Sequence, residues 1–103
     1  MTDINEHIEA IRKFADARDW GKFHTPKNLA MAIAGEAGEL AAEFQWLTPE
    51  QSTELLSEKL NSVALEMADI AIYLIRLSDV LNIDLNDYIN KKMSINETRF
   101  PAK

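Results

Sequence analysis

Apolar residues recur along this chain at intervals of three and four positions and seldom alternate with polar ones. This period matches α-helices that bury one face, whereas half-buried strands would show alternation. Only three glycines and three prolines interrupt the pattern. We therefore predict an all-α protein with four helices and no strands.

Capping residues locate the ends of these helices. Thr25-Pro26 and Thr48-Pro49 each place an N-cap hydroxyl before a proline at the first helical position, where the missing N–H costs nothing. Asp3 and Asp84 stand at equivalent positions before apolar residues. The predicted helices run from Asp3 to about Arg18, from Pro26 to about Trp46, from Pro49 to about Leu81 with a break allowed near Ser57, and from Asp84 through Met93. We expect a loose tail over residues 95–103.

The segment at residues 63–77, VALEMADIAIYLIRL, is apolar on nearly all sides. A helix of that kind is normally buried. A chain of 103 residues has too few helices to surround it, so we expect a second copy of the protein to cover one side. The predicted architecture is a four-helix bundle completed by homo-oligomerisation, as a homodimer or a dimer of dimers.

Length and composition narrow the class of protein. A chain of 103 residues has the usual size of one domain, here residues 1–103. It has no cysteine, so a metal would be held by carboxylates or by its two histidines. A net charge of −6 argues against a nucleic-acid surface. We expect a soluble cytoplasmic protein that binds neither nucleic acid nor membrane, because the sequence has neither a signal-like leader nor an apolar run of bilayer length.

Two acidic pairs lie on the predicted second and third helices. Glu36 and Glu39 are three residues apart, and so are Glu66 and Asp69. That spacing puts both carboxylates of a pair on one face, so two antiparallel helices can aim four carboxylates at one point. Crowded carboxylates need raised pKa values or a cation, and oxygen ligands suit Mg²⁺ or Mn²⁺.

Solvated helix faces are the ordinary alternative for such acidic pairs. The apolar sequence around Glu66 and Asp69 argues against it, since burying a carboxylate among apolar residues is costly without compensation. Gly35 and Gly38 lie inside the second predicted helix, where each glycine costs about 1 kcal/mol relative to alanine. We interpret these glycines as a sign of close packing. The pattern therefore favours a metal site.

Aromatic residues supply candidates for a base pocket. Tyr73 lies one turn beyond Asp69, and Trp46 continues the face of Glu39. These two rings are the better candidates to stack on a nucleobase. Packing in the core is the alternative for them and for Trp20.

The other polar candidates have weaker signals. His24 precedes a helix N-cap, where a local hydrogen bond is the commonest role. Lys91, Lys92, Asn96 and Arg99 near the end of the chain can either bind phosphate or complement the dipole of the last helix.

Three segments, EAGELAAEFQW, EMADIAIYL and KKMSINETRFP, resemble the MazG-like all-α nucleoside triphosphate pyrophosphohydrolases, and most closely their dCTP pyrophosphatase branch. The resemblance covers nearly the whole chain. It implies a metal site at the acids that match the family's EExxE and ExxD motifs, which are Glu36, Glu39, Glu66 and Asp69. Gly35 stands in place of the first glutamate of EExxE, as in the dCTP pyrophosphatase branch, which leaves four acids to hold metal.

The resemblance also implies a substrate site. The segment ARDWGKFHTPKNLAMAI is similar to the stretch that precedes the first acidic motif in the dCTP pyrophosphatase branch. The predicted substrate-binding residues are Trp20, His24, Trp46, Tyr73, Lys92, Asn96 and Arg99. Ile11 occupies the place of a histidine in the vertebrate-type enzymes, so the base preference is left open.

The expected activity is Mg²⁺-dependent hydrolysis of (deoxy)nucleoside triphosphates to monophosphate and pyrophosphate, with dCTP-like or non-standard dNTPs as house-cleaning substrates. The four acids would be both metal ligands and catalytic residues, one glutamate being the general base. Two alternatives remain. One is a related enzyme that acts on dUTP or phosphoribosyl-ATP, and the other is a non-catalytic helical oligomer that holds a structural ion.

Overall fold

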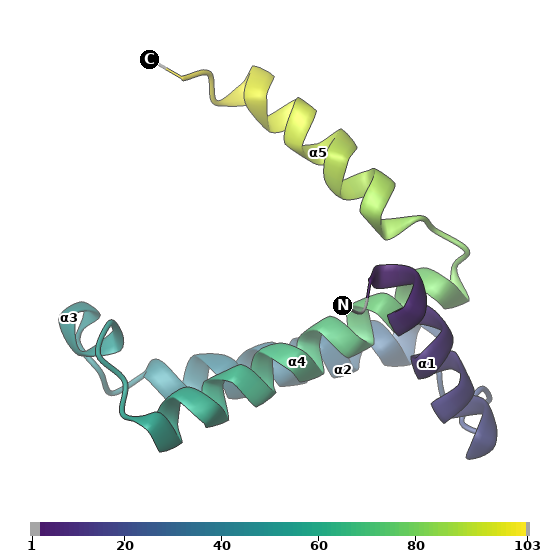
Figure 1. Cartoon of the computed structure of the whole chain (residues 1–103), viewed down its shortest axis with the longest axis horizontal. Helices are drawn as coiled ribbons and strands as arrows, with labels where there is room; N and C mark the ends of the chain where they lie inside the picture. Colours follow the sequence, from purple (N-terminus) through teal and green to yellow (C-terminus); the bar gives the residue numbers. More distant parts are fainter. Residues whose placement is uncertain (1–2, 103) are drawn as a thin grey trace.

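The computed structural model describes residues 3–102, and all of its regular structure is helical (Figure 1). The five helices are α1 (Ile4–Ala17), α2 (Pro26–Phe44), α3 (Pro49–Ser52), α4 (Ser57–Val80) and α5 (Leu85–Arg99). No strand occurs within these residues. The predicted all-α class is confirmed.

Side-chain caps fix the helix starts where the sequence predicts them. The Asp3 carboxylate accepts a hydrogen bond from the Glu6 backbone N–H at 2.9 Å, and the Thr25 hydroxyl accepts one from the Asn28 N–H at 3.2 Å. Thr48 and Gln51 form a reciprocal capping box, with bonds of 3.1 and 3.0 Å. Each cap satisfies N–H groups that have no partner inside the helix.

The third predicted helix is two helices. α3 has only four residues, and the chain leaves helical geometry before Leu56, whose φ of −67° and ψ of 156° are extended. The hydroxyls of Ser52 and Thr53 donate to the carbonyls of Pro49 and Glu50 at 2.6 and 2.7 Å. Such local bonds compete with helix continuation. The break therefore falls just before Ser57, and the count rises from four helices to five.

The last helix is longer than the sequence pattern predicts. α5 continues to Arg99, so residues 95–99 are helical and the predicted end at Met93 is wrong. No glycine or proline follows Met93 until Pro101. A proline disfavours helical geometry in the residue before it, and Phe100 indeed leaves the helix with a φ of −130° and a ψ of 67°.

Helices α2 and α4 lie side by side along their length and form an antiparallel pair, as Figure 1 shows. α1 packs against α4 near the C-terminal end of that helix. α5 leaves the end of α4 and projects away from the pair (Figure 1). The described helices of one chain therefore do not close into a four-helix bundle by themselves.

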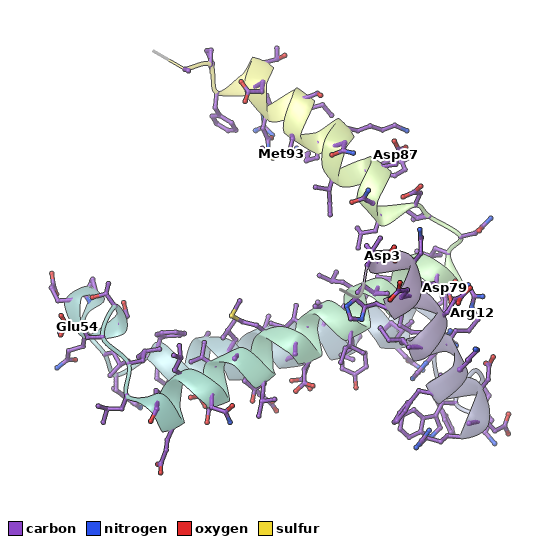
Figure 2. The ribbon with its side chains drawn as sticks, in the orientation of Figure 1. Asp3, Arg12, Glu54, Asp79, Asp87 and Met93 are labelled. Carbon is purple, nitrogen blue, oxygen red and sulfur yellow. The ribbon has the colours of Figure 1, made fainter. Side chains whose placement is uncertain are left out.

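One chain buries little apolar surface. Among the described residues, the buried apolar side chains are Ala15, Leu29 and Val63. Large apolar side chains of α4 and α5 are exposed, including Leu65, Met67, Ile89 and Met93, and Figure 2 shows α5 with its side chains standing clear of the pair. The accessible surface of 8110 Å² exceeds the roughly 5,900 Å² expected for a folded monomer of 11.7 kDa.

None of the described helices combines the length and the apolar content that crossing a bilayer requires.

Candidate active site

Three carboxylates from α2 and α4 converge between the two helices. Glu36 and Glu39 come from α2 and Glu66 from α4, and one oxygen of each lies within 4.8 Å of the others. The spacing of three residues puts Glu36 and Glu39 on one face of α2, and the antiparallel pairing brings Glu66 opposite them. The predicted meeting of the two acidic pairs thus occurs for these three residues.

Two of these carboxylates bury an oxygen without a partner. Glu36 Oε2 and Glu66 Oε2 are inaccessible to solvent and have no hydrogen bond among the described residues. A buried oxygen of this kind costs free energy unless a proton or a cation satisfies it. These two oxygens are therefore candidate positions for a bound proton or a cation.

The electrostatics point the same way. Burial, followed by the neighbouring carboxylates of Glu39, Glu66 and Asp69, raises the pKa of Glu36 to about 7. Burial is also the largest cause that raises the pKa of Glu66. The metal-free cluster thus retains a proton well above the usual pH range of a carboxylic acid. A divalent cation would replace that proton and stabilise the ionised forms.

The donor set fits a hard cation. All three converging groups are carboxylates, and neither sulfur nor nitrogen belongs to the cluster. Such ligands suit Mg²⁺ or Mn²⁺. Asp69, the fourth predicted ligand, lies outside the cluster and lines the adjoining pocket together with Glu36.

A pocket of about 230 Å³ adjoins the carboxylates. It combines aromatic and apolar walls with a few polar groups, the usual make-up of a small-ligand site. Its lining residues are Ile11, Phe14, Ala15, Trp20, His24, Glu36, Asp69, Ile72, Tyr73 and Arg76. Three residues predicted to bind substrate, Trp20, His24 and Tyr73, therefore meet at one place.

The turn between α1 and α2 positions two of these side chains. Asp19 adopts a left-handed φ of 55°, and the backbone N–H of Trp20 donates to the Ala15 carbonyl at 3.0 Å. The N–H of His24 then donates to the Trp20 carbonyl at 3.1 Å. The turn brings the two rings edge to face, with centroids 6.0 Å apart.

Four predicted substrate residues lie elsewhere. Trp46 is 88% exposed beyond the end of α2, at the opposite end of the helix pair from Tyr73. α4 rises about 24 Å between Ser57 and Tyr73, so the predicted pairing of Trp46 with Tyr73 is wrong within one chain. Lys92, Asn96 and Arg99 lie on α5, which projects away from the pocket.

Sequence reasoning missed Arg76, which lines the pocket and is only 7% exposed. A signal was present, since Arg76 is the one basic residue in the apolar segment 63–77 and follows Tyr73 by three positions. The His24 side chain makes a long-range contact in place of the local bond that is the commonest role before an N-cap. Its Nδ1 accepts a hydrogen bond from Arg76 Nε at 3.1 Å, across 52 residues of sequence.

Comparison with known proteins bears on this arrangement. No protein-family model matches the chain. A pyrophosphatase from Archaeoglobus fulgidus has the same fold, with a TM-score of 0.91 and 38% identity, over 99% of this chain and 95% of that one. The chain belongs to the MazG-like all-α pyrophosphatase family. The sequence resemblance to this family is thereby confirmed.

Curated relatives specify the branch of the family. The chain is 41% identical to dCTP pyrophosphatase 1 of Homo sapiens and 38% identical to that of Mus musculus, each over 92% of the chain. It spans 59% of the length of each of these relatives. Within the family, the chain is therefore similar to the dCTP pyrophosphatase branch.

Proposed function

We propose that this chain is a Mg²⁺-dependent nucleoside triphosphate pyrophosphohydrolase, which hydrolyses (deoxy)nucleoside triphosphates to monophosphate and pyrophosphate. One observation carries the proposal: the two buried, unpartnered carboxylate oxygens of Glu36 and Glu66 lie beside an aromatic pocket. A cation site and a pocket for a flat ring, side by side, suit a ligand with a polyphosphate at one end and a base at the other.

The carboxylates have complementary roles in this proposal. Glu36, Glu39 and Glu66 would hold the ion, and Asp69 would complete the site from the edge of the pocket. When bound, Mg²⁺ neutralises phosphate charge and favours ionisation of a water molecule. One of these glutamates would accept the proton of the attacking water as general base.

The pocket would hold the base. Trp20 and Tyr73 offer ring faces or edges, and Phe14 packs against Trp20 with centroids 5.6 Å apart. The volume of about 230 Å³ is below the roughly 300–1,000 Å³ of pockets for drug-sized ligands. It suits a single base better than a larger group.

We propose dCTP or a modified relative of it as the first substrate to test, since the curated relatives are dCTP pyrophosphatases. The apolar Ile11 lines the pocket, so the choice of base rests on the remaining polar groups. dUTP and phosphoribosyl-ATP are the enzymatic alternatives. A non-catalytic oligomer with a structural ion is the alternative from another class.

We further propose a homodimer or dimer of dimers, in which a partner copy completes a four-helix bundle. Two features support this assembly: the excess accessible surface of one chain, and the exposed apolar side chains of α4 and α5. The partner copy would also supply Trp46, Lys92, Asn96 and Arg99, because these residues do not reach the pocket of their own chain. Light scattering at micromolar concentration is the test, and a monomer would contradict the assembly.

The experiment for the activity is a panel of standard and modified (d)NTPs with Mg²⁺, scored separately for pyrophosphate and orthophosphate. We expect pyrophosphate release that requires Mg²⁺ or Mn²⁺ and is abolished by a chelator. Metal binding without release from any nucleotide would favour the structural-ion alternative. Orthophosphate as the primary product would rule out the proposed reaction.

A further inference from the structure

A buried arginine forms one wall of the aromatic pocket. Arg76 is 7% exposed and extends from α4 toward the turn that carries His24. Its Nε–H donates to His24 Nδ1 at 3.1 Å, and one terminal N–H donates to Asp79 Oδ2 at 3.4 Å. Two hydrogen bonds in different directions fix the plane of the guanidinium.

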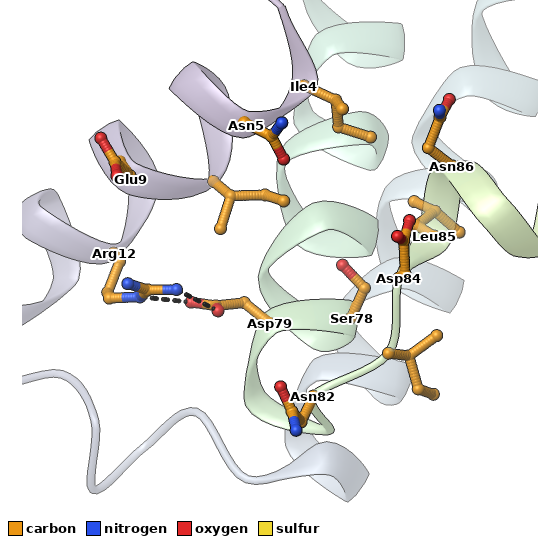
Figure 3. A pocket seen from close by; sticks show the side chains of 12 residues that line it. Ile4, Asn5, Glu9, Arg12, Ser78, Asp79, Asn82, Asp84, Leu85 and Asn86 are labelled. Atoms are coloured by element: carbon orange, nitrogen blue, oxygen red, sulfur yellow. Dashed lines mark hydrogen bonds and ion pairs between the residues drawn. The ribbon is translucent and has the colours of Figure 1, made fainter.

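Asp79 is itself held from the other side. Arg12 on α1 donates two hydrogen bonds to the Asp79 carboxylate, at 2.9 and 2.6 Å, and Figure 3 shows this paired contact. Hydrogen bonding to Arg12 is the largest cause that lowers the pKa of Asp79, so this carboxylate stays ionised. The Arg12–Asp79 pair lies outside the aromatic pocket and in a separate cavity. It anchors the far side of Arg76 without reaching the pocket.

The bond to Arg76 determines which nitrogen of His24 carries a proton. A guanidinium has donors and no acceptor. His24 Nδ1 must therefore present a lone pair, and the proton of the neutral ring resides on Nε2. Burial and the charge of Arg76 lower the pKa of His24, which favours the neutral ring. Nε2 has no hydrogen-bond partner among the described residues.

We propose that Arg76 is a positioning residue that fixes His24 as the Nε2–H tautomer, so that His24 donates a hydrogen bond to an acceptor atom of the bound base. The acceptor would be a ring nitrogen or carbonyl oxygen on the edge of the base. The edge-to-face contact with Trp20 holds the His24 ring in the same orientation. This inference rests on the proposed function of the pocket and adds a specific polar contact to it.

The tautomer can be measured without any substrate. Long-range ¹H–¹⁵N NMR of the metal-free protein, labelled at histidine, distinguishes protonated from unprotonated ring nitrogens. The chain has two histidines, and His7, which is exposed on α1, serves as the internal reference. We expect His24 to give the pure Nε2–H pattern at mildly alkaline pH and His7 to give an exchanging mixture. An Nδ1–H pattern for His24 in the wild type would overturn the inference, whatever any variant does.

Two matched variants then connect the tautomer to binding. Arg76→Met keeps an unbranched side chain that reaches about as far as Nε and removes the donors. Arg12→Met makes the same change in charge and disturbs the same Asp79, but does not touch His24. We expect Arg76→Met to convert the His24 signals to a mixture and to raise KM for dCTP about tenfold, the loss of one hydrogen bond, with little change in kcat. Arg12→Met should keep the His24 pattern and a KM within about twofold of the wild type.

The outcomes separate this inference from the proposed function. If the wild type hydrolyses dCTP but Arg76→Met keeps both the tautomer and the KM, the inference is wrong and the function stands. If no nucleotide is hydrolysed, the proposed function fails, and the NMR result alone decides whether Arg76 sets the tautomer. If Arg76→Met does not fold, Arg76→Lys replaces it and should raise KM in the same direction, because a lysine lacks the planar donor at Nε.

Discussion

The α2–α4 pair and α5 differ in whether a single copy of the chain brings their proposed site residues to one place. The α2–α4 pair brings three carboxylates together, and with α1 and the following turn it encloses a pocket. α5 carries Lys92, Asn96 and Arg99 but projects away from that pocket. The comparison teaches that contacts within one chain are enough to bring the acidic residues of the proposed site together, whereas the basic residues of α5 do not reach that site within one chain.

The largest loss of activity should come from changes in the carboxylate cluster, which one chain assembles by itself. We expect Glu66→Gln to lower kcat on the order of a hundredfold or more, because it removes a charge from the buried cluster. Glu43→Gln is the matched control. Glu43 lies one turn beyond Glu39 on α2 but pairs with Lys59 at 3.0 Å and should leave kcat near the wild-type value. Equal losses of kcat in the two variants would mean that the buried cluster has no catalytic role beyond that of any acidic residue on α2 or α4.

The next largest loss of activity should come from the basic residues of α5, which do not reach the pocket within one chain. We expect Lys92→Met to lower kcat/KM by about tenfold to a hundredfold through the loss of a phosphate contact. Lys91→Met is its control, since Lys91 pairs with Asp87 of its own helix at 3.1 Å. Mixing Glu66→Gln with Lys92→Met subunits after unfolding and refolding should give an activity clearly above that of either variant alone. No recovery in a mixed oligomer would mean that α5 serves its own chain.

The metal-free cluster should make stability depend on pH. The folded state raises the pKa of Glu36 from about 4.5 to about 7. It therefore binds more protons than the unfolded state between these values, and stability present below about pH 4.5 is lost as the pH rises through about 7. We expect the melting temperature in a chelator to fall over this range, and to fall less in Glu36→Gln. Added Mg²⁺ should oppose the fall, because it binds the ionised carboxylates.

The smallest effect concerns the glycines of α2. A Cβ added at Gly38 would meet no heavy atom within 4 Å, and the same holds at Gly35, so the close packing expected from the sequence is absent within one chain. We expect Gly38→Ala to stabilise the protein by up to about 1 kcal/mol in urea unfolding, through helix propensity alone. A loss of stability would instead locate a partner copy on this face of α2.

Sequence periodicity and caps are sufficient to predict most of the local structure. The starts of α1, α2 and α3 follow from Asp3, Thr25 and Thr48, because capping is decided by neighbouring residues. The break allowed near Ser57 occurs just before that residue, although the hydroxyl-to-carbonyl bonds that end α3 have no strong sequence signature.

The site residues likewise differ in whether local sequence spacing is enough to predict them. Glu36, Glu39 and Glu66 can be predicted together because helical spacing puts the acids of each helix on one face, and antiparallel packing of the two helices turns those faces toward each other. The Arg76–His24 contact cannot, because it joins residues 52 positions apart through a turn whose geometry is set by Trp20 and Ala15. Trp46 does not meet Tyr73 within one chain, because lying on the face of the carboxylates does not fix the position of a residue along the helix.

The central claim is that the carboxylate cluster and its pocket cleave a nucleoside triphosphate between the α- and β-phosphates. ³¹P NMR of dCTP incubated with the protein and Mg²⁺ tests it most directly. We expect the dCTP signals to be replaced by those of dCMP and pyrophosphate. No reaction should occur with a chelator, and Glu66→Gln should react about a hundredfold more slowly, or slower still. Formation of dCDP and orthophosphate by the wild type, or formation of dCMP and pyrophosphate by Glu66→Gln at the wild-type rate, would contradict it.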